Sequence, residues 1–149
     1  MNSSKENFRQ CDTISELPDF VKSVENHTRK IQINPKLKNS FYYRGKARFE
    51  LEDYDGAIAD FSEYIDFDPK FEVAYYRRGC AKSKISQYKE AIEDFNTAIG
   101  IKNNYAWAFY NRGLARIELG QRNLAFIDFT KAIELGLSEA SEAIIDYYE

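Results

Sequence analysis

Apolar positions at helical spacing recur along this chain at one constant interval, which Gly45, Gly79 and Gly113 mark. An aromatic residue lies four positions before each glycine, an alanine lies two positions after it, and three more apolar positions follow. These positions are Phe41, Tyr75 and Phe109; Ala47, Ala81 and Ala115; Ala57, Ala91 and Ala125; Phe61, Phe95 and Phe129; and Ile65, Ile99 and Ile133. A period of this size predicts a stacked array of helix pairs.

The first unit of this period contains two stretches with the pattern of an amphipathic helix. Residues 40–51 contain no proline, and residues 54–67 place apolar side chains at spacings of three and four. Asp68 and Pro69 are expected to end the second helix. The later units repeat this plan without insertion or deletion, which predicts six helices in three units, residues 38–71, 72–105 and 106–139.

The glycine of each unit is expected to let its two helices approach closely. We place Gly45 on the first helix opposite Ala57 on the second, with the same arrangement in the later units. A glycine inside a helix costs about 1 kcal/mol relative to alanine. Close packing of the two helices must offset this cost.

Both ends of the array carry further helical patterns. Residues 15–34 predict an N-terminal amphipathic helix, and Pro35 lies one full period before Pro69, so this helix is interpreted as half of a degenerate repeat. Residues 138–149 predict a C-terminal capping helix that covers the third unit. Residues 1–14 are expected to form a flexible N-terminus.

Each glycine is preceded by an arginine, and an aspartate follows that arginine at a fixed distance along the chain. A buried unpaired charge is costly. The register therefore predicts a repeated ion pair between the two helices of each unit, with a geometry that can be bidentate. The alternative is a basic ladder that binds an anionic ligand. The expected pairs are Arg44 with Asp60, Arg78 with Asp94, and Arg112 with Asp128.

With these residues in place, the chain resembles tetratricopeptide-repeat proteins over residues 38–139. The family pattern is matched in the first unit by Phe41, Gly45, Ala57, Phe61 and Pro69. The later units match it at the first four of these positions, but Asn103 and Leu137 replace the proline. The chain departs from the pattern where arginine replaces a leucine, and where Arg48, Lys82 and Arg116 replace a tyrosine. The resemblance implies an all-α fold, a right-handed α-solenoid of three helix-turn-helix units with flanking N-terminal and C-terminal capping helices.

The resemblance also implies that the first helices of successive units line a concave groove for a peptide. The expected groove residues are Asn39, Tyr42, Tyr43, Lys46, Phe49, Val73, Tyr76, Arg77, Cys80, Ser83, Trp107, Tyr110, Asn111, Leu114 and Ile117. In the third unit Trp107, Leu114 and Ile117 form a second apolar stripe, which would be exposed unless a ligand covers it. The alternatives are burial by the N-terminal helix or by another copy of the chain.

Composition and charge exclude several function classes. The 149 residues carry a net charge of -3, which gives no attraction for nucleic acid or an anionic membrane. Cys11, Cys80 and the single histidine, His27, form no metal-site spacing, and no catalytic motif occurs. We expect no enzyme activity, cofactor or metal. Because residues 1–10 lack the apolar core of a secretory signal, we expect a cytoplasmic protein.

The expected function is that of an adaptor or scaffold with a protein or peptide partner. The family's clamp for the carboxylate of chaperone tails is not reproduced, because Tyr42 and Trp107 stand where it needs cations, although Lys46 and Asn111 fit loosely. Two alternatives are a self-associating scaffold, such as a homodimer, and an RNA-binding helical-repeat protein. The acidic composition argues against RNA.

Overall fold

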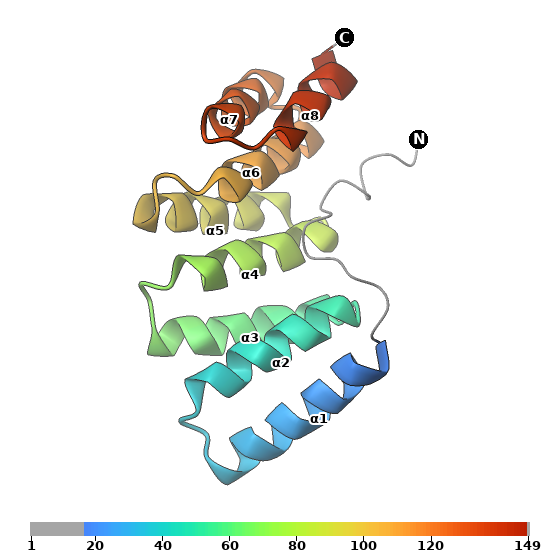
Figure 1. Cartoon of the computed structure of the whole chain (residues 1–149), viewed down its shortest axis with the longest axis vertical. Coiled ribbons are helices and arrows are strands. Elements are labelled where there is room, and N and C mark those ends of the chain that lie inside the picture. The colour runs from blue at the N-terminus through green and yellow to red at the C-terminus, as the bar shows by residue number, and fades with distance from the viewer. Residues whose placement is uncertain (1–16, 149) are drawn as a thin grey trace.

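The computed structural model describes residues 17–148, which form eight α-helices and no strand. Figure 1 shows them stacked along the long axis of the molecule, from α1 at one end to α7 and α8 at the other. Their bounds are α1 Leu17–Ile33, α2 Lys38–Glu50, α3 Tyr54–Phe67, α4 Glu72–Lys84, α5 Tyr88–Ile101, α6 Ala106–Glu118, α7 Arg122–Glu134 and α8 Glu139–Tyr148. The predicted all-α class is confirmed. The predicted flexible N-terminus, residues 1–14, lies outside the described residues.

Helices that are neighbours in sequence are neighbours in space. The pairs α2 with α3, α4 with α5, and α6 with α7 pack together, and each pair contacts the next through α3 with α4 and α5 with α6. The helices α1 and α8 pack on α2 and α7. Helices α2 to α8 thus bury apolar side chains against adjacent helices, as in a solenoid, whereas α1 covers α2 with half-buried side chains. The division of the chain into three repeats, 38–71, 72–105 and 106–139, with an N-terminal half repeat at 15–34 and a cap at 138–149, is our proposal.

The two helices of each pair approach closely at the periodic glycines, where the nearest side chain is a phenylalanine ring. A Cβ atom added at Gly113 would lie 2.6 Å from Cε1 of Phe129, and one at Gly79 would lie 2.8 Å from Cε1 of Phe95. The two phenylalanines have no exposed surface. The ring one turn after the alanine is thus the group that meets each glycine most closely. The phenylalanine comes one turn after the alanine, and its ring fills the space that the missing side chain leaves.

The turn inside each pair has one residue with positive φ at the same place in the period. Glu52 has φ 61°, Ser86 has φ 63° and Gly120 has φ 72°. This left-handed conformation ends the first helix and favours glycine. The turn geometry is thus common to all three pairs. Only the third pair has a glycine there, Gly120, which adopts this conformation without strain.

Candidate functional site

Each predicted arginine and aspartate pair is joined by two hydrogen bonds between the helices of one pair. The Nε atoms of Arg44, Arg78 and Arg112 donate to Oδ2 of their aspartates at 2.9, 2.9 and 3.0 Å. The Nη2 atoms donate to Oδ1 at 2.7, 2.7 and 2.6 Å. The aspartates are buried, with exposed fractions of 2%, 4% and 1% for Asp60, Asp94 and Asp128. This bidentate geometry is the strong form of such a pair.

Each buried aspartate also has a second cation, which the sequence reasoning did not pair with it. Nη1 of Arg48 lies 3.0 Å from Asp60, Nζ of Lys82 lies 2.8 Å from Asp94, and Nη1 of Arg116 lies 2.6 Å from Asp128. These cations replace the family's tyrosine one helical turn after the arginine. The signal was present in the sequence, because all three precede an aspartate by the same interval.

The third nitrogen of each arginine bonds to the preceding helix pair. Nη1 donates to Thr28 Oγ1 at 3.2 Å, to Ser62 Oγ at 3.0 Å and to Asn96 Oδ1 at 2.7 Å, from Arg44, Arg78 and Arg112 respectively. Each guanidinium therefore joins three helices. Because its donors bond to the protein itself, this geometry supports the structural interpretation of the arginines over the anion-binding alternative.

The predicted groove residues divide into three groups by exposure. Asn39 and Tyr43 are exposed, whereas Tyr42, Lys46, Val73, Arg77, Trp107 and Ile117 are half-buried. The others are buried: Phe49, Tyr76, Cys80, Ser83, Tyr110, Asn111 and Leu114. We call the eight exposed and half-buried residues, all on α2, α4 and α6, the first-helix face. The buried residues cannot contact a ligand without rearrangement, so the accessible part is smaller than the sequence predicted.

Two of the periodic tyrosines are hydrogen-bonded to the following helix pair. Nε of Arg77 donates to the hydroxyl of Tyr42 at 3.1 Å, and Nδ2 of Asn111 donates to the hydroxyl of Tyr76 at 2.9 Å. The two bonds occupy the same place in successive pairs. These tyrosines therefore join neighbouring pairs, which is a role that the sequence reasoning did not predict.

The apolar stripe of the third pair is packed against α8. Leu114 is buried in a cluster with Ala140 and Ala143, and Trp107 and Ile117 pack at its edge. Leu114 is therefore covered neither by a ligand nor by the N-terminal helix or a second copy, but by the C-terminal helix that the sequence predicted to cap the third unit. The alanines of α8 are small enough to bring that helix close, and the C-terminal helix thus removes Leu114 from the surface.

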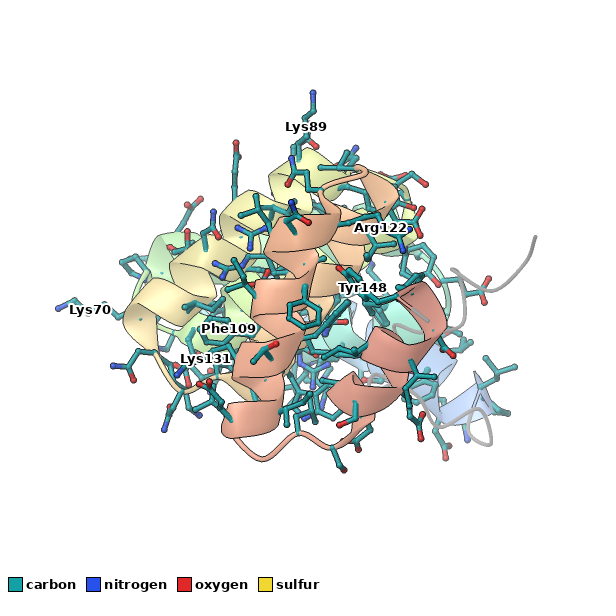
Figure 2. All side chains as sticks on the ribbon, turned by 90° about the horizontal axis from the view of Figure 1, so that it is seen from above. Lys70, Lys89, Phe109, Arg122, Lys131 and Tyr148 are labelled. Carbon is teal, nitrogen blue, oxygen red and sulfur yellow. The ribbon has the colours of Figure 1, made fainter. Side chains whose placement is uncertain are left out.

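The end of α8 is fixed to the start of α7 by Tyr148. Its hydroxyl donates to the backbone carbonyl of Arg122, and its ring lies edge-on to Phe126 with the centroids 5.3 Å apart. The Arg122 guanidinium also lies 5.2 Å from the centre of the Tyr148 ring. Figure 2, which views the molecule from its C-terminal end, shows Tyr148 and Arg122 together on this face.

Burial raises the pKa of the Tyr110 hydroxyl to about 12, and the neighbouring Tyr147, Glu142, Asp146 and Glu139 contribute to this rise. The ordinary pKa is 10.0, so the folded state disfavours the phenolate. Its contribution to stability is therefore complete below pH 10 and decreases as the pH rises from 10 to 12. We expect stability to fall steeply over this range in urea titrations, and to fall less in Tyr110→Phe. An equal fall in both proteins would contradict this prediction.

His27 lies on α1 with its ring stacked on Tyr43, at 5.6 Å between centroids. Burial lowers its pKa, and the positive charges of Lys30 and Arg44 lower it further. The Nδ1 atom is buried without a hydrogen-bond partner. Among residues 17–148, no group of histidine, cysteine or acidic side chains has the arrangement of a metal site.

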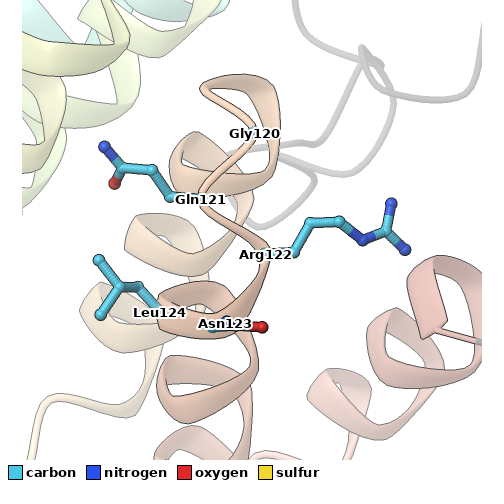
Figure 3. A pocket seen from close by; sticks show the side chains of 5 residues that line it. All are labelled: Gly120, Gln121, Arg122, Asn123 and Leu124. Carbon is cyan, nitrogen blue, oxygen red and sulfur yellow. The ribbon is translucent and has the colours of Figure 1, made fainter.

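A cavity of about 290 Å³ lies at the turn between α6 and α7 and is lined by Gly120, Gln121, Arg122, Asn123 and Leu124. Figure 3 shows that the side chains of Gln121 and Arg122 point to opposite sides. A catalytic or small-ligand site requires polar groups that converge on one point, and the polar groups here do not.

No helix in the described part of the chain is long and apolar enough to cross a membrane.

Comparisons with known proteins agree with this architecture. The family described as "Tetratricopeptide repeat" matches residues 39–70 and 108–135, and the family described as "TPR repeat" matches residues 81–120. No curated protein sequence matches the chain.

Solved structures that are similar to the chain include the following three. The second TPR of Spaghetti (RPAP3), bound to the HSP90 peptide SRMEEVD, is 33% identical with a TM-score of 0.65, over 71% of this chain and 98% of that one. MamA is 25% identical with a TM-score of 0.73, over 79% of this chain and 69% of that one. The Arabidopsis OM64 TPR domain is 23% identical with a TM-score of 0.72, over 74% of this chain and 93% of that one. At this identity the likeness shows a shared fold alone.

Proposed function

Because the chain belongs to the tetratricopeptide-repeat family, we propose that it is a non-catalytic adaptor or scaffold whose first-helix face binds a peptide segment of a partner protein. The observation that carries the proposal is the similarity to the RPAP3 domain, which extends over nearly all of that domain and includes a bound peptide. The accessible residues of the first-helix face are the candidate contacts. We further propose a cytoplasmic location, and no cofactor.

The first-helix face offers two kinds of contact for such a peptide. Tyr43 is 50% exposed, and half-buried Trp107 lies on the same face at the other end of the helix array. Large aromatic side chains supply much of the binding energy at protein interfaces. Lys46 and Arg77 lie on the same face and carry positive charge. The partner segment is therefore expected to combine apolar side chains with carboxylates.

The RPAP3 structure holds an acidic chaperone peptide, but we do not extend that specificity to this chain. The chain has Tyr42 and Trp107 where the family's carboxylate clamp needs cations, and Tyr42 accepts a hydrogen bond from Arg77. Asn111, which fits the clamp loosely in sequence, is buried and bonded to Tyr76. We propose a partner segment other than a chaperone tail.

The double variant Tyr43→Ala with Trp107→Ala tests the proposal. Peptides are first selected from a displayed random library on the wild-type protein, and affinities are then measured by calorimetry. Groove-bound peptides of this kind bind at about micromolar strength, roughly -8 kcal/mol. We expect the double variant to lose at least about tenfold in affinity, because it removes two aromatic contacts. Tyr76, which is buried, is not a suitable probe.

The control is Ile101→Ala, which removes an exposed apolar side chain from the end of α5 and should leave the affinity unchanged. Lys46→Glu is a second test that does not touch the packing of Trp107. The proposal fails if the double variant and Lys46→Glu both bind the selected peptides as tightly as the wild type. A shift of single-stranded RNA that weakens with salt would instead favour the RNA-binding alternative.

A further inference from the structure

Exposed large apolar side chains are concentrated at the two ends of the helix stack. Between Lys38 and Glu118, only Tyr43, Phe67 and Ile101 belong to this class. The N-terminal end carries Leu17, Val21, Ile33 and Leu37, and the C-terminal end carries Leu124, Phe126, Ile127, Ile133 and Ile145. Terminal repeats of a solenoid normally present a polar outer face to water. Both ends of this stack expose charged side chains too, but they combine them with these large apolar ones.

The C-terminal end differs from the inner pairs at equivalent positions. Ile127 of α7, which is 61% exposed, stands where the earlier pairs have Ala59 and Glu93. Ile127 lines a shallow open depression of about 250 Å³ on α7, together with Phe126, Thr130, Lys131 and Glu134. We call these five residues, together with Glu142, Ile145 and Asp146 of α8, the C-terminal end face. Phe126 also packs on Tyr148 within the monomer, whereas Ile127 is largely exposed, and an exposed apolar side chain of this kind suits a docking surface.

The two ends also hold complementary halves of the repeat. Helix α8 follows α7 and begins at Glu139, close to one period after the start of α6, so it occupies the place of a first helix without a second. Helix α1 ends at Ile33, one period before the end of α3. Thr28 of α1 accepts a hydrogen bond from Arg44, just as Ser62 of α3 accepts one from Arg78. It therefore occupies the place of a second helix. Within residues 17–148 it has no first helix of its own.

The charges of the two ends are opposite in sign. Helix α8 carries Glu139, Glu142 and Asp146 and no cation. Helix α1 and the turn after it carry four cations, Lys22, Arg29, Lys30 and Lys36, against two carboxylates, Asp19 and Glu25. Figure 1 shows these helices at opposite ends of the stack. Pairing of like ends would therefore bring like charges together, whereas contact between opposite ends is attractive.

We propose that the chain stacks head to tail on a second copy, with the C-terminal end face of one protomer against the N-terminal end face of the next. The N-terminal end face consists of Leu17, Val21, Lys22, Arg29 and Ile33. Contact between unlike surfaces can repeat and produce chains of protomers rather than closed pairs. The first-helix face does not take part, so this inference is independent of the proposed peptide-binding function.

Two variants that each block one end test the proposal by sedimentation of the full chain. Ile127→Lys places a positive charge where the basic N-terminal end of a neighbour would dock, and Val21→Glu places a negative charge where the acidic C-terminal end would dock. We expect the wild-type mass to rise with concentration above the 17.4 kDa of one chain. Each variant alone should remain a monomer. An equimolar mixture should form dimers, because the unaltered C-terminal end of one variant can dock on the unaltered N-terminal end of the other.

Glu93→Lys is the matched control, since it introduces lysine at the position of α5 equivalent to Ile127 and should assemble like the wild type. Higher salt should weaken assembly, because the opposite charges are screened. The proposal is overturned if the wild type is a monomer at all concentrations, or if either variant still pairs alone, which would indicate contact between like ends. A mixture that stays monomeric would also overturn it.

Discussion

Replacing Asp94 by leucine is expected to lower the free energy of unfolding by about 3–5 kcal/mol. The carboxylate is buried and accepts from Nε and Nη2 of Arg78 at 2.9 and 2.7 Å, and Nζ of Lys82 lies 2.8 Å from it. Leucine leaves these two cations close together in a largely buried place with no anion. The cost should be seen in urea unfolding followed by circular dichroism.

A double-mutant cycle with Arg78→Met separates this pairing from general packing. If the two side chains act as a pair, the double variant should lose less stability than the sum of the two single variants. For two independent sites, the loss of stability in the double variant equals the sum of the two single losses within about 0.5 kcal/mol. A coupling free energy no larger than this would contradict the pairing. Asp66→Leu, which removes an exposed carboxylate from α3, is a control for the loss of one negative charge, and we expect it to change stability little.

Replacing Gly113 by valine is expected to cost about 3 kcal/mol or more, because it overpacks a closed contact. A Cβ at this position already lies 2.6 Å from Cε1 and 2.9 Å from Cδ1 of Phe129, and that ring has no exposed surface into which it could move. Valine adds two further methyl groups. The α6–α7 pair must therefore separate, which also weakens the packing of α8 on α7. Thermal unfolding provides the measurement.

Gly100→Val is the matched control for this prediction. Gly100 lies in α5, and an added Cβ there meets no atom within 4 Å. Valine and glycine differ by only a few tenths of a kcal/mol in helix propensity, so we expect almost no change. Equal losses in Gly100→Val and Gly113→Val would show that helix propensity, and not the contact with Phe129, sets the cost.

The repeat period was sufficient to predict the helices. The predicted second helix of the first unit, residues 54–67, has the same bounds as α3, and the following pairs begin at the same interval. The constant spacing between each arginine and its aspartate, as from Arg78 to Asp94, likewise indicated which side chains meet. Both are properties of local order, because a helix fixes which residues share a face and the period repeats that face.

The exposure of the predicted groove could not be read from one helix at a time. Tyr76 and Leu114 have the same helical phase as accessible residues, yet the first bonds to Asn111 of the next pair and the second packs against α8. Burial depends on how far a neighbouring helix extends and how closely it approaches. The distance between two helices results from the packing of all side chains between them, so it cannot be predicted from a short-range sequence pattern.

The sequence by itself determined the helices, their pairing along the chain and the register that places a cation near each buried aspartate, because these follow from the repeat period and from helical spacing. Only the tertiary structure decided which faces remain in contact with water. It showed α8 over Leu114, the second cation at each aspartate and the apolar side chains exposed at both ends of the stack. The physical reason is that burial is a property of the assembled helices.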